Sequence, residues 1–154
     1  MKVLGTLLVM SVVAVGAFVM SASASAAAHC HGLKATMVGT QGSDNIVGTN
    51  HTDVIVARGG DDIVRSGGGR DVICAGRGGD EVNAGERHDR VYGGRGLDDL
   101  RGAAGADLLF GQRGRDQLFG RSENDTLNGG LGIDEGFGGS GVDTCLSIEF
   151  AHGC

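Results

Sequence analysis

A nine-residue period from Gly39 to Leu146 constrains the fold of this chain more than any other feature of its sequence. Twelve repeats follow one another over 108 residues without an insertion or a deletion. The sixth position of every repeat is aspartate, and the eighth is apolar in all but one, where Gly136 stands. The fourth position is glycine in nine repeats; the three departures are His51, Arg87 and Glu123. A short fixed period of this kind predicts a solenoid, in which each repeat packs only on its neighbours.

The composition of one repeat predicts a turn followed by a short strand. Glycine adopts positive φ without steric cost, so the glycine-rich positions one to six are expected to form a tight turn. Positions seven to nine are expected to form a strand, in which position eight points inward and positions seven and nine point outward. Two repeats then complete one coil of eighteen residues. We therefore expect an all-β fold, a parallel β-roll or β-solenoid of about six coils with degenerate caps, in which aspartates eighteen residues apart stack at about 4.8 Å.

Stacked aspartates require a counter-charge. Two carboxylates about 5 Å apart repel each other by roughly 3 kcal/mol at an effective dielectric constant near 20, and by roughly 1 kcal/mol in water. A dication bound by carboxylates and by turn carbonyls would offset this repulsion, and oxygen ligation without thiolate or imidazole favours calcium over zinc. Magnesium fits less well because it requires a tight octahedron. The sequence thus predicts several Ca²⁺ ions as cofactors. Their candidate ligands are Asp44, Asp53, Asp62, Asp71, Asp80, Asp89, Asp98, Asp107, Asp116, Asp125, Asp134 and Asp143.

The repeats resemble a known family. Ala57–Arg65 (ARGGDDIVR), Gly93–Arg101 (GGRGLDDLR) and Gly102–Phe110 (GAAGADLLF) are similar to the RTX, or hemolysin-type, calcium-binding nonapeptide G-G-x-G-x-D-x-U-x of secreted bacterial proteins. The resemblance implies a β-roll with calcium held between same-side turns of successive coils. It also implies that each ion takes the aspartate and carbonyls two and four of one turn, with the aspartate and carbonyls one and three of the next. The candidate position-four carbonyls are those of Gly42, Gly60, Gly78, Gly96 and Gly114.

The three departures at position four all lie in even-numbered repeats. We call the turns of the odd-numbered repeats the odd edge and those of the even-numbered repeats the even edge. The odd edge keeps glycine throughout, and its six aspartates predict a ladder of up to five ions, one in each gap. We expect weaker or partial binding at the even edge, where a β-carbon strains the turn and Arg87 adds positive charge. The alternative is that the aspartate suffices and the turn tolerates any residue.

Residues 1–28 are typical of a secretory signal. Lys2 precedes an apolar run, Val3–Val19, and the Ser/Ala tract that follows offers cleavage sites after Ala24, Ala26 or Ala28. The run is short for a membrane span. We expect cleavage, an extracellular (secreted) mature protein and no membrane span after removal of the signal; an uncleaved anchor is the alternative.

The segments that flank residues 39–146 resemble incomplete repeats, which are typical of solenoid caps. In the predicted N-terminal cap, residues 29–38, Met37 takes the inward position and Ala35 replaces the aspartate. In the predicted C-terminal cap, residues 147–154, His152 falls at the aspartate position.

Four cysteines remain after the signal, namely Cys30, Cys74, Cys145 and Cys154. An even number in an exported chain favours two disulfides, for which three pairings are possible. Proximity in sequence favours Cys30–Cys74 and Cys145–Cys154, one at each cap. Free buried thiols are the alternative; a zinc site is disfavoured because there is no C-x-x-C spacing.

Four aromatic residues occupy outward position nine, namely Tyr92, Phe110, Phe119 and Phe137. They suggest a docking patch for a cell-surface glycan or a protein; the alternative is that they pack against a cap or a neighbouring strand. Nucleic acid is not expected as a partner, because the arginines are scattered over turns among acids and do not form a basic stripe with aromatics.

These features predict a secreted calcium-binding protein whose β-roll folds on binding Ca²⁺ between stacked turns. A calcium-dependent adhesin or matrix-interaction protein is the alternative. We do not expect an enzyme, since the repeats leave little other chain and neither H-E-x-x-H nor G-x-S-x-G occurs.

Overall fold

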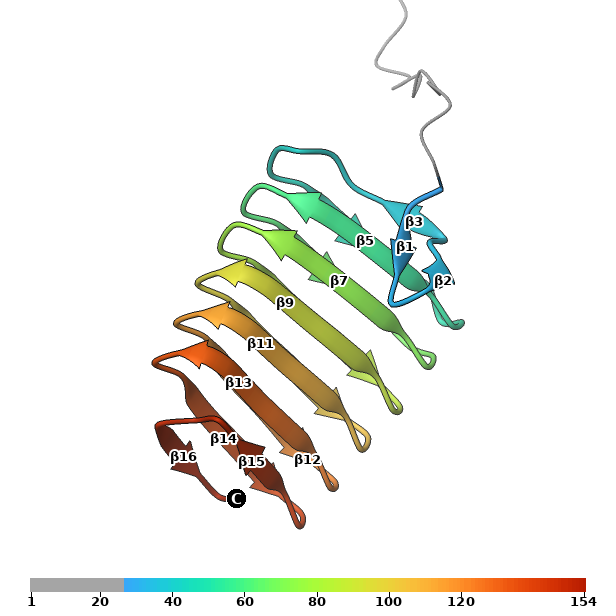
Figure 1. The fold of residues 1–154 in the computed structure, drawn as a ribbon. Helices are drawn as coiled ribbons and strands as arrows, with labels where there is room; N and C mark the ends of the chain where they lie inside the picture. Colours follow the sequence, from blue (N-terminus) through green and yellow to red (C-terminus); the bar gives the residue numbers. More distant parts are fainter. Residues whose placement is uncertain (1–26) are drawn as a thin grey trace, which may run out of the picture.

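The computed structural model describes residues 27–154, so the predicted signal segment lies almost wholly outside the described residues. The described chain is a solenoid of two parallel seven-stranded sheets, with a two-stranded hairpin at its N-terminal end (Figure 1). This confirms the predicted β-roll. No helix long and apolar enough to cross a membrane is present in residues 27–154.

Successive strands alternate between the two sheets. We name each sheet by its outermost strands. The β3–β15 sheet contains β3 (Met37–Val38), β5 (Val54–Gly59), β7 (Val72–Arg77), β9 (Arg90–Gly96), β11 (Leu108–Gly114), β13 (Thr126–Gly132) and β15 (Thr144–Leu146). The β4–β16 sheet contains β4 (Asn45–Val47), β6 (Ile63–Arg65), β8 (Glu81–Glu86), β10 (Asp99–Ala104), β12 (Gln117–Ser122), β14 (Glu135–Ser140) and β16 (Phe150–His152). The hairpin pairs β1 (His29–Cys30) with β2 (Leu33–Lys34).

The strands are longer than the sequence predicts. We expected positions one to six to lie in the turn, but β7 and its neighbours continue through positions one to three of the next repeat. The pairing between β7 and β9 skips Ala75 and resumes at Gly76, whose φ of 122° is left-handed. The equivalent strand one coil away supplies the hydrogen-bond partners. The ladder therefore continues after this interruption, even though the local sequence favours a turn.

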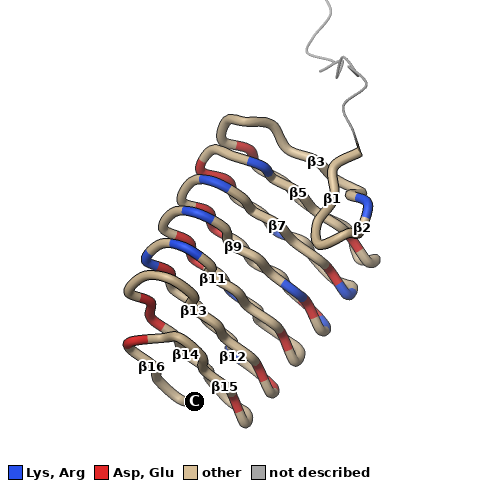
Figure 2. Tube along the Cα trace, in the orientation of Figure 1, with Lys and Arg blue, Asp and Glu red and all other residues tan. Residues whose placement is uncertain are grey.

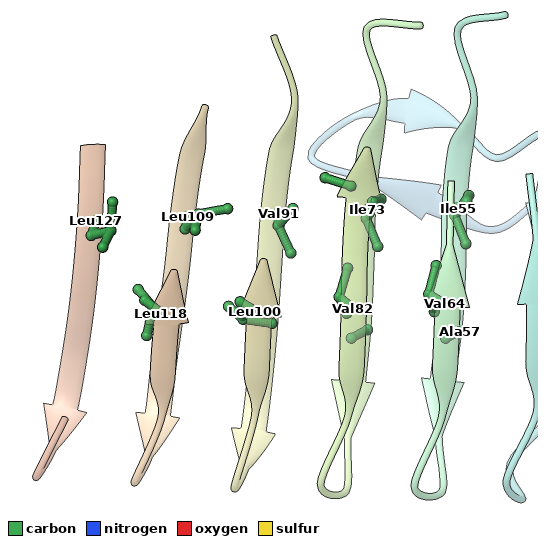
Figure 3. Packing of buried hydrophobic residues seen from close by; sticks show 12 residues of the cluster. Ile55, Ala57, Val64, Ile73, Val82, Val91, Leu100, Leu109, Leu118 and Leu127 are labelled. Atoms are coloured by element: carbon green, nitrogen blue, oxygen red, sulfur yellow. The ribbon is translucent and has the colours of Figure 1, made fainter. Parts of the chain in front are cut away.

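Position eight fills the core, as predicted. Nine of these side chains are fully buried between the sheets, and Figure 3 shows them pointing into one layer. They are Ile55, Val64, Ile73, Val82, Val91, Leu100, Leu109, Leu118 and Leu127. The departure at Gly136 is compensated: a β-carbon there would meet the side chain of Ile148, which packs against the core from the last coil.

Both ends are closed by the predicted disulfides. Cys30 is bonded to Cys74 and Cys145 to Cys154, and no cysteine in the described residues is free. The first bond ties the N-terminal hairpin to β7 across 44 residues. This arrangement excludes thiolate ligation by these four residues.

The predicted register of the C-terminal cap is wrong. His152 does not occupy the aspartate position: β16 pairs Phe150 with Glu135 and His152 with Phe137, which places His152 at an outward position nine. Its ring stacks on Phe137 with centroids 4.8 Å apart. The last turn is three residues shorter than the others, and register extrapolated from the repeats therefore fails there.

The four position-nine aromatics do not form one patch. Tyr92 and Phe110 lie on the β3–β15 sheet and stack at 5.0 Å, whereas Phe119 and Phe137 stack at 5.0 Å on the opposite sheet. His31 from the N-terminal hairpin covers Tyr92 at 3.6 Å. All four rings are half-buried. The rings thus pack against the caps and neighbouring strands, as the alternative interpretation states.

Candidate metal centre

The aspartates stack in two ladders, one on each edge, as the period predicts. On the odd edge, the backbone N–H of Asp80 donates to Oδ1 of Asp98 at 3.0 Å, and Asp98 donates to Asp116 in the same way. The same bond joins each aspartate to the one eighteen residues later, from Asp44 to Asp134 on the odd edge and from Asp53 to Asp143 on the even edge. One carboxylate oxygen of each later aspartate is therefore used in a hydrogen bond between successive coils.

The second carboxylate oxygen is left unpaired. Oδ2 is buried and has no hydrogen-bond partner within residues 27–154 in ten of the twelve aspartates. These are Asp62, Asp71, Asp80, Asp89, Asp98, Asp107, Asp116, Asp125, Asp134 and Asp143. A buried charged oxygen without a donor is strongly unfavourable. Ten such atoms at repeated positions are the feature that a row of bound cations would satisfy.

Burial makes the carboxylates in the middle of the two ladders hard to ionise. Burial raises the pKa of Asp89 to about 8 and that of Asp98 and Asp107 to about 7. Repulsion by the stacked neighbours raises the pKa further, and the bond from the N–H of the preceding aspartate lowers it. The same causes raise the pKa to about 6 in Asp80, Asp116 and Asp125. Without a counter-charge, Asp89, Asp98 and Asp107 in the middle of the ladders therefore retain protons near neutral pH.

The predicted carbonyls lie in the gaps between turns. A β-carbon added at Gly78, Gly96 or Gly114 would meet the carbonyl oxygen of the position-four glycine one coil earlier. In the same way, a β-carbon added at Gly60 would meet the carbonyl group of Gly42, and one added at Gly132 would meet the carbonyl oxygen of Gly114. All five candidate carbonyls therefore face the position-four glycine of the next coil on the odd edge. Glycine is needed at this position because the carbonyl occupies the space of a side chain.

The two edges differ in backbone conformation at position four. The glycines there, apart from Gly42, have φ between 109° and 153°, whereas Arg87 and Glu123 have φ of 80° and 77°. These two residues occupy the left-handed region at a steric cost, as the sequence predicts. His51 is different, since its φ is not positive. The even edge thus has the same unpaired Oδ2 atoms but altered turns at Arg87 and Glu123.

The first coil is satisfied by protein atoms that the sequence analysis missed. The hydroxyl of Thr40 donates to Oδ2 of Asp44 at 3.0 Å, and that of Thr49 donates to Oδ2 of Asp53 at 2.9 Å. Threonine occurs at position two only in these two repeats, and this difference in the sequence could have indicated the two hydrogen bonds. The first aspartate of each edge therefore already has a hydrogen-bond donor at Oδ2, and it is less available to a cation than the aspartates that follow it.

Glu149 was also missed. Its Oε2 accepts the backbone N–H of Asp134 at 2.7 Å, which is the bond that an aspartate makes everywhere else on the odd edge. The residue lies fifteen positions after Asp134 instead of eighteen, so the period gives no indication of it.

Side chains alone do not complete a cation site. No group of three or more His, Cys, Asp or Glu side chains converges in the part of the chain that the structure describes. Each gap instead offers carboxylates from successive turns together with backbone carbonyls. This all-oxygen donor set suits a hard cation of flexible coordination, namely calcium.

A parallel β-roll with stacked aspartate turns, in which one buried oxygen of most carboxylates has no hydrogen-bond partner within residues 27–154, is the architecture of a calcium-binding repeat protein. The family model of the RTX calcium-binding nonapeptide repeat matches the chain in four copies, over residues 38–73, 75–109, 101–136 and 110–145. These matches span most of the chain, and the chain belongs to this family. No curated protein and no solved structure is significantly similar to it.

Proposed function

We propose that the chain is a secreted, non-enzymatic calcium-binding protein whose β-roll becomes stable when Ca²⁺ binds between successive turns. The observation that carries the proposal is the set of ten buried Oδ2 atoms without a hydrogen-bond partner. In the calcium-free roll these oxygens must be protonated or remain buried and charged, and both states limit the stability of the fold. A ligand that binds only the folded state stabilises it by mass action.

The ligands follow from the geometry of the gaps. On the odd edge we assign binding to the aspartates from Asp62 to Asp134 and to the carbonyls of Gly60, Gly78, Gly96 and Gly114. The gap between Asp44 and Asp62, with the carbonyl of Gly42, is the weakest of this edge because Thr40 already satisfies Asp44. On the even edge we assign the aspartates from Asp71 to Asp143, with lower affinity at the turns that contain Arg87 and Glu123.

Export is supported by two independent features. The first is the sequence of residues 1–28, and the second is the pair of disulfides, which persist in oxidising compartments outside the cytosol. Calcium is abundant there, and affinities of about 10⁻⁴ to 10⁻³ M are typical of extracellular modules. Mass spectrometry of the protein from the culture medium tests this part: the chain should begin at residue 25, 27 or 29 and contain no free thiol.

Circular dichroism of the mature chain during a calcium titration tests the main proposal. We expect the β-sheet signal and the melting temperature to rise with calcium, and to rise far less with magnesium at the same concentration. Restoring the chelator should reverse both changes. Equal spectra and equal melting temperatures in chelator and in calcium would overturn the proposal.

A further inference from the structure

The two outer faces of the roll differ in charge. The strands of the β3–β15 sheet contain five arginines and no acidic residue. Those of the β4–β16 sheet contain three arginines and four acidic residues. One face is therefore basic in a protein whose formal net charge is −6. The expectation that the arginines are scattered among acids is wrong for this face.

Three of these arginines form a row across neighbouring strands. Arg77, Arg95 and Arg113 stand at the third position of successive odd-numbered repeats, and their Cα atoms are direct partners in β7, β9 and β11. They are about 4.8 Å apart, the spacing of paired strands. Arg58 in β5 lies one residue earlier in the register, so that basic residues mark four consecutive strands in Figure 2. We call these four residues the arginine row.

The arginine row has no carboxylate partner. The ion pairs in residues 27–154 involve only Arg101 and His152 as cations, and both lie on the opposite sheet. Like charges directly opposite each other on a sheet are destabilising. A row of unpaired guanidinium groups is thus an unfavourable arrangement that a bound anion would relieve.

The row borders a depression of about 550 Å³ on the outer surface of the β3–β15 sheet. Arg58, Arg77, Arg95 and Arg113 line it together with His31 and Tyr92. The ring of Tyr92 is covered by His31 on one side and by Phe110 on the other, with centroids 3.6 Å and 5.0 Å away. No face of Tyr92 is left for a nucleobase to stack on, which disfavours a single-stranded nucleic acid at this surface.

We propose that the arginine row binds a linear acidic polysaccharide. Each guanidinium group presents paired N–H donors that match a carboxylate or a sulfate group. A straight row with one cation per strand fits a polymer that carries anionic groups on successive sugars, whereas a small anion would contact only one or two neighbouring arginines of the row. The proposal goes beyond calcium binding and requires only that the roll be folded.

Binding to heparin, a sulfated chain, and to polygalacturonate, a carboxylated chain, tests the proposal and distinguishes the two anionic groups. The variant Arg77→Gln/Arg95→Gln/Arg113→Gln removes three charges from the row. The control Arg65→Gln/Arg70→Gln/Arg90→Gln removes the same charge from exposed arginines that do not line the depression. Neutral dextran and a single-stranded oligonucleotide serve as further ligands.

We expect the row variant to lose affinity for at least one acidic polysaccharide by about tenfold or more, since charge-assisted hydrogen bonds are lost. The control variant should lose much less, and dextran should not bind. Equal losses in the two variants, absence of binding to both acidic polysaccharides, or tighter binding of the oligonucleotide would overturn the proposal.

Circular dichroism of the same samples separates this test from that of the calcium proposal. Binding is measured only on protein with the folded spectrum, and the calcium titration is performed without polysaccharide. The row variant should keep the calcium response of the unmodified chain, because no side chain of the row belongs to the aspartate ladders. A calcium-independent fold that still binds polysaccharide through the row would refute the calcium proposal and leave this one standing.

Discussion

Replacing Asp98 by asparagine should have opposite effects with and without calcium. Asp98 lies in the middle of the odd edge, where its Oδ1 accepts the N–H of Asp80 at 3.0 Å and its Oδ2 is buried without a partner. Asparagine keeps the first oxygen and replaces the second by an amide N–H₂. The variant Asp98→Asn therefore removes the charge and preserves the hydrogen bond that serves the fold.

The magnitude follows from the pKa of Asp98, which burial raises from 3.8 to about 7. At pH 8 a shift of about 3 pKa units corresponds to roughly 4 kcal/mol that the calcium-free fold loses on ionisation and the variant recovers. A buried unpaired amide costs about 1 to 3 kcal/mol. The expected net gain of the calcium-free variant is about 1 to 3 kcal/mol.

The sign reverses when calcium is bound. A site with calcium at a hundred times its dissociation constant contributes about 2.7 kcal/mol to stability. Asp98 borders two gaps of the odd edge, so losing both sites removes about 5 kcal/mol; set against the gain of about 1 to 3 kcal/mol in the calcium-free variant, the calcium-loaded protein should lose about 2 to 4 kcal/mol.

The assay is the fraction of folded protein by circular dichroism at pH 8, in chelator and in saturating calcium, with urea added where the protein is fully folded. The control is Asp61→Asn, which removes an exposed charge and keeps the acceptor for the N–H of Gly79. It should change the stability by less than about 0.5 kcal/mol in both conditions. An effect of Asp98→Asn with the same sign in both conditions would refute this account of the ladder.

Three further outcomes are expected. In chelator, stability should fall as the pH rises from about 4 to 8, because the folded state holds protons on six aspartates with pKa values of about 6 to 8 after the unfolded chain has released them; a higher melting temperature at pH 8 than at pH 5 would contradict this. Arg87→Gly should increase the calcium bound at the even edge, measured by equilibrium dialysis, and an unchanged stoichiometry and affinity would show that the edges are equivalent. Serine substitution of Cys30 and Cys74, which are 44 residues apart, should lower stability by roughly 4 kcal/mol, against roughly 3 for Cys145 and Cys154, which are 9 apart; a larger loss from the second pair in denaturant titrations would refute the loop-length argument.

The sequence by itself determined the features that repeat. The nine-residue period fixed the coil, the inward position eight and the two aspartate ladders, because each repeat makes the same contacts as its neighbours. The sequence also favoured both disulfides, since these two pairs are nearer in sequence than the pairs of either alternative pairing. Three members of the arginine row were also visible in the sequence, at the third position of three odd-numbered repeats, but along the chain they alternate with the acidic residues of the turns.

Only the tertiary structure decided the features that depend on pairing between coils. The strands extend through positions one to three because the next coil supplies hydrogen-bond partners that the local sequence does not indicate. Glu149 replaces an aspartate, and His152 stacks on Phe137, because the last turn is three residues shorter and the repeat no longer sets the register. The division of each carboxylate into one bonded oxygen and one unpaired oxygen has the same origin. It is set by the distance between coils, a quantity that no single repeat contains.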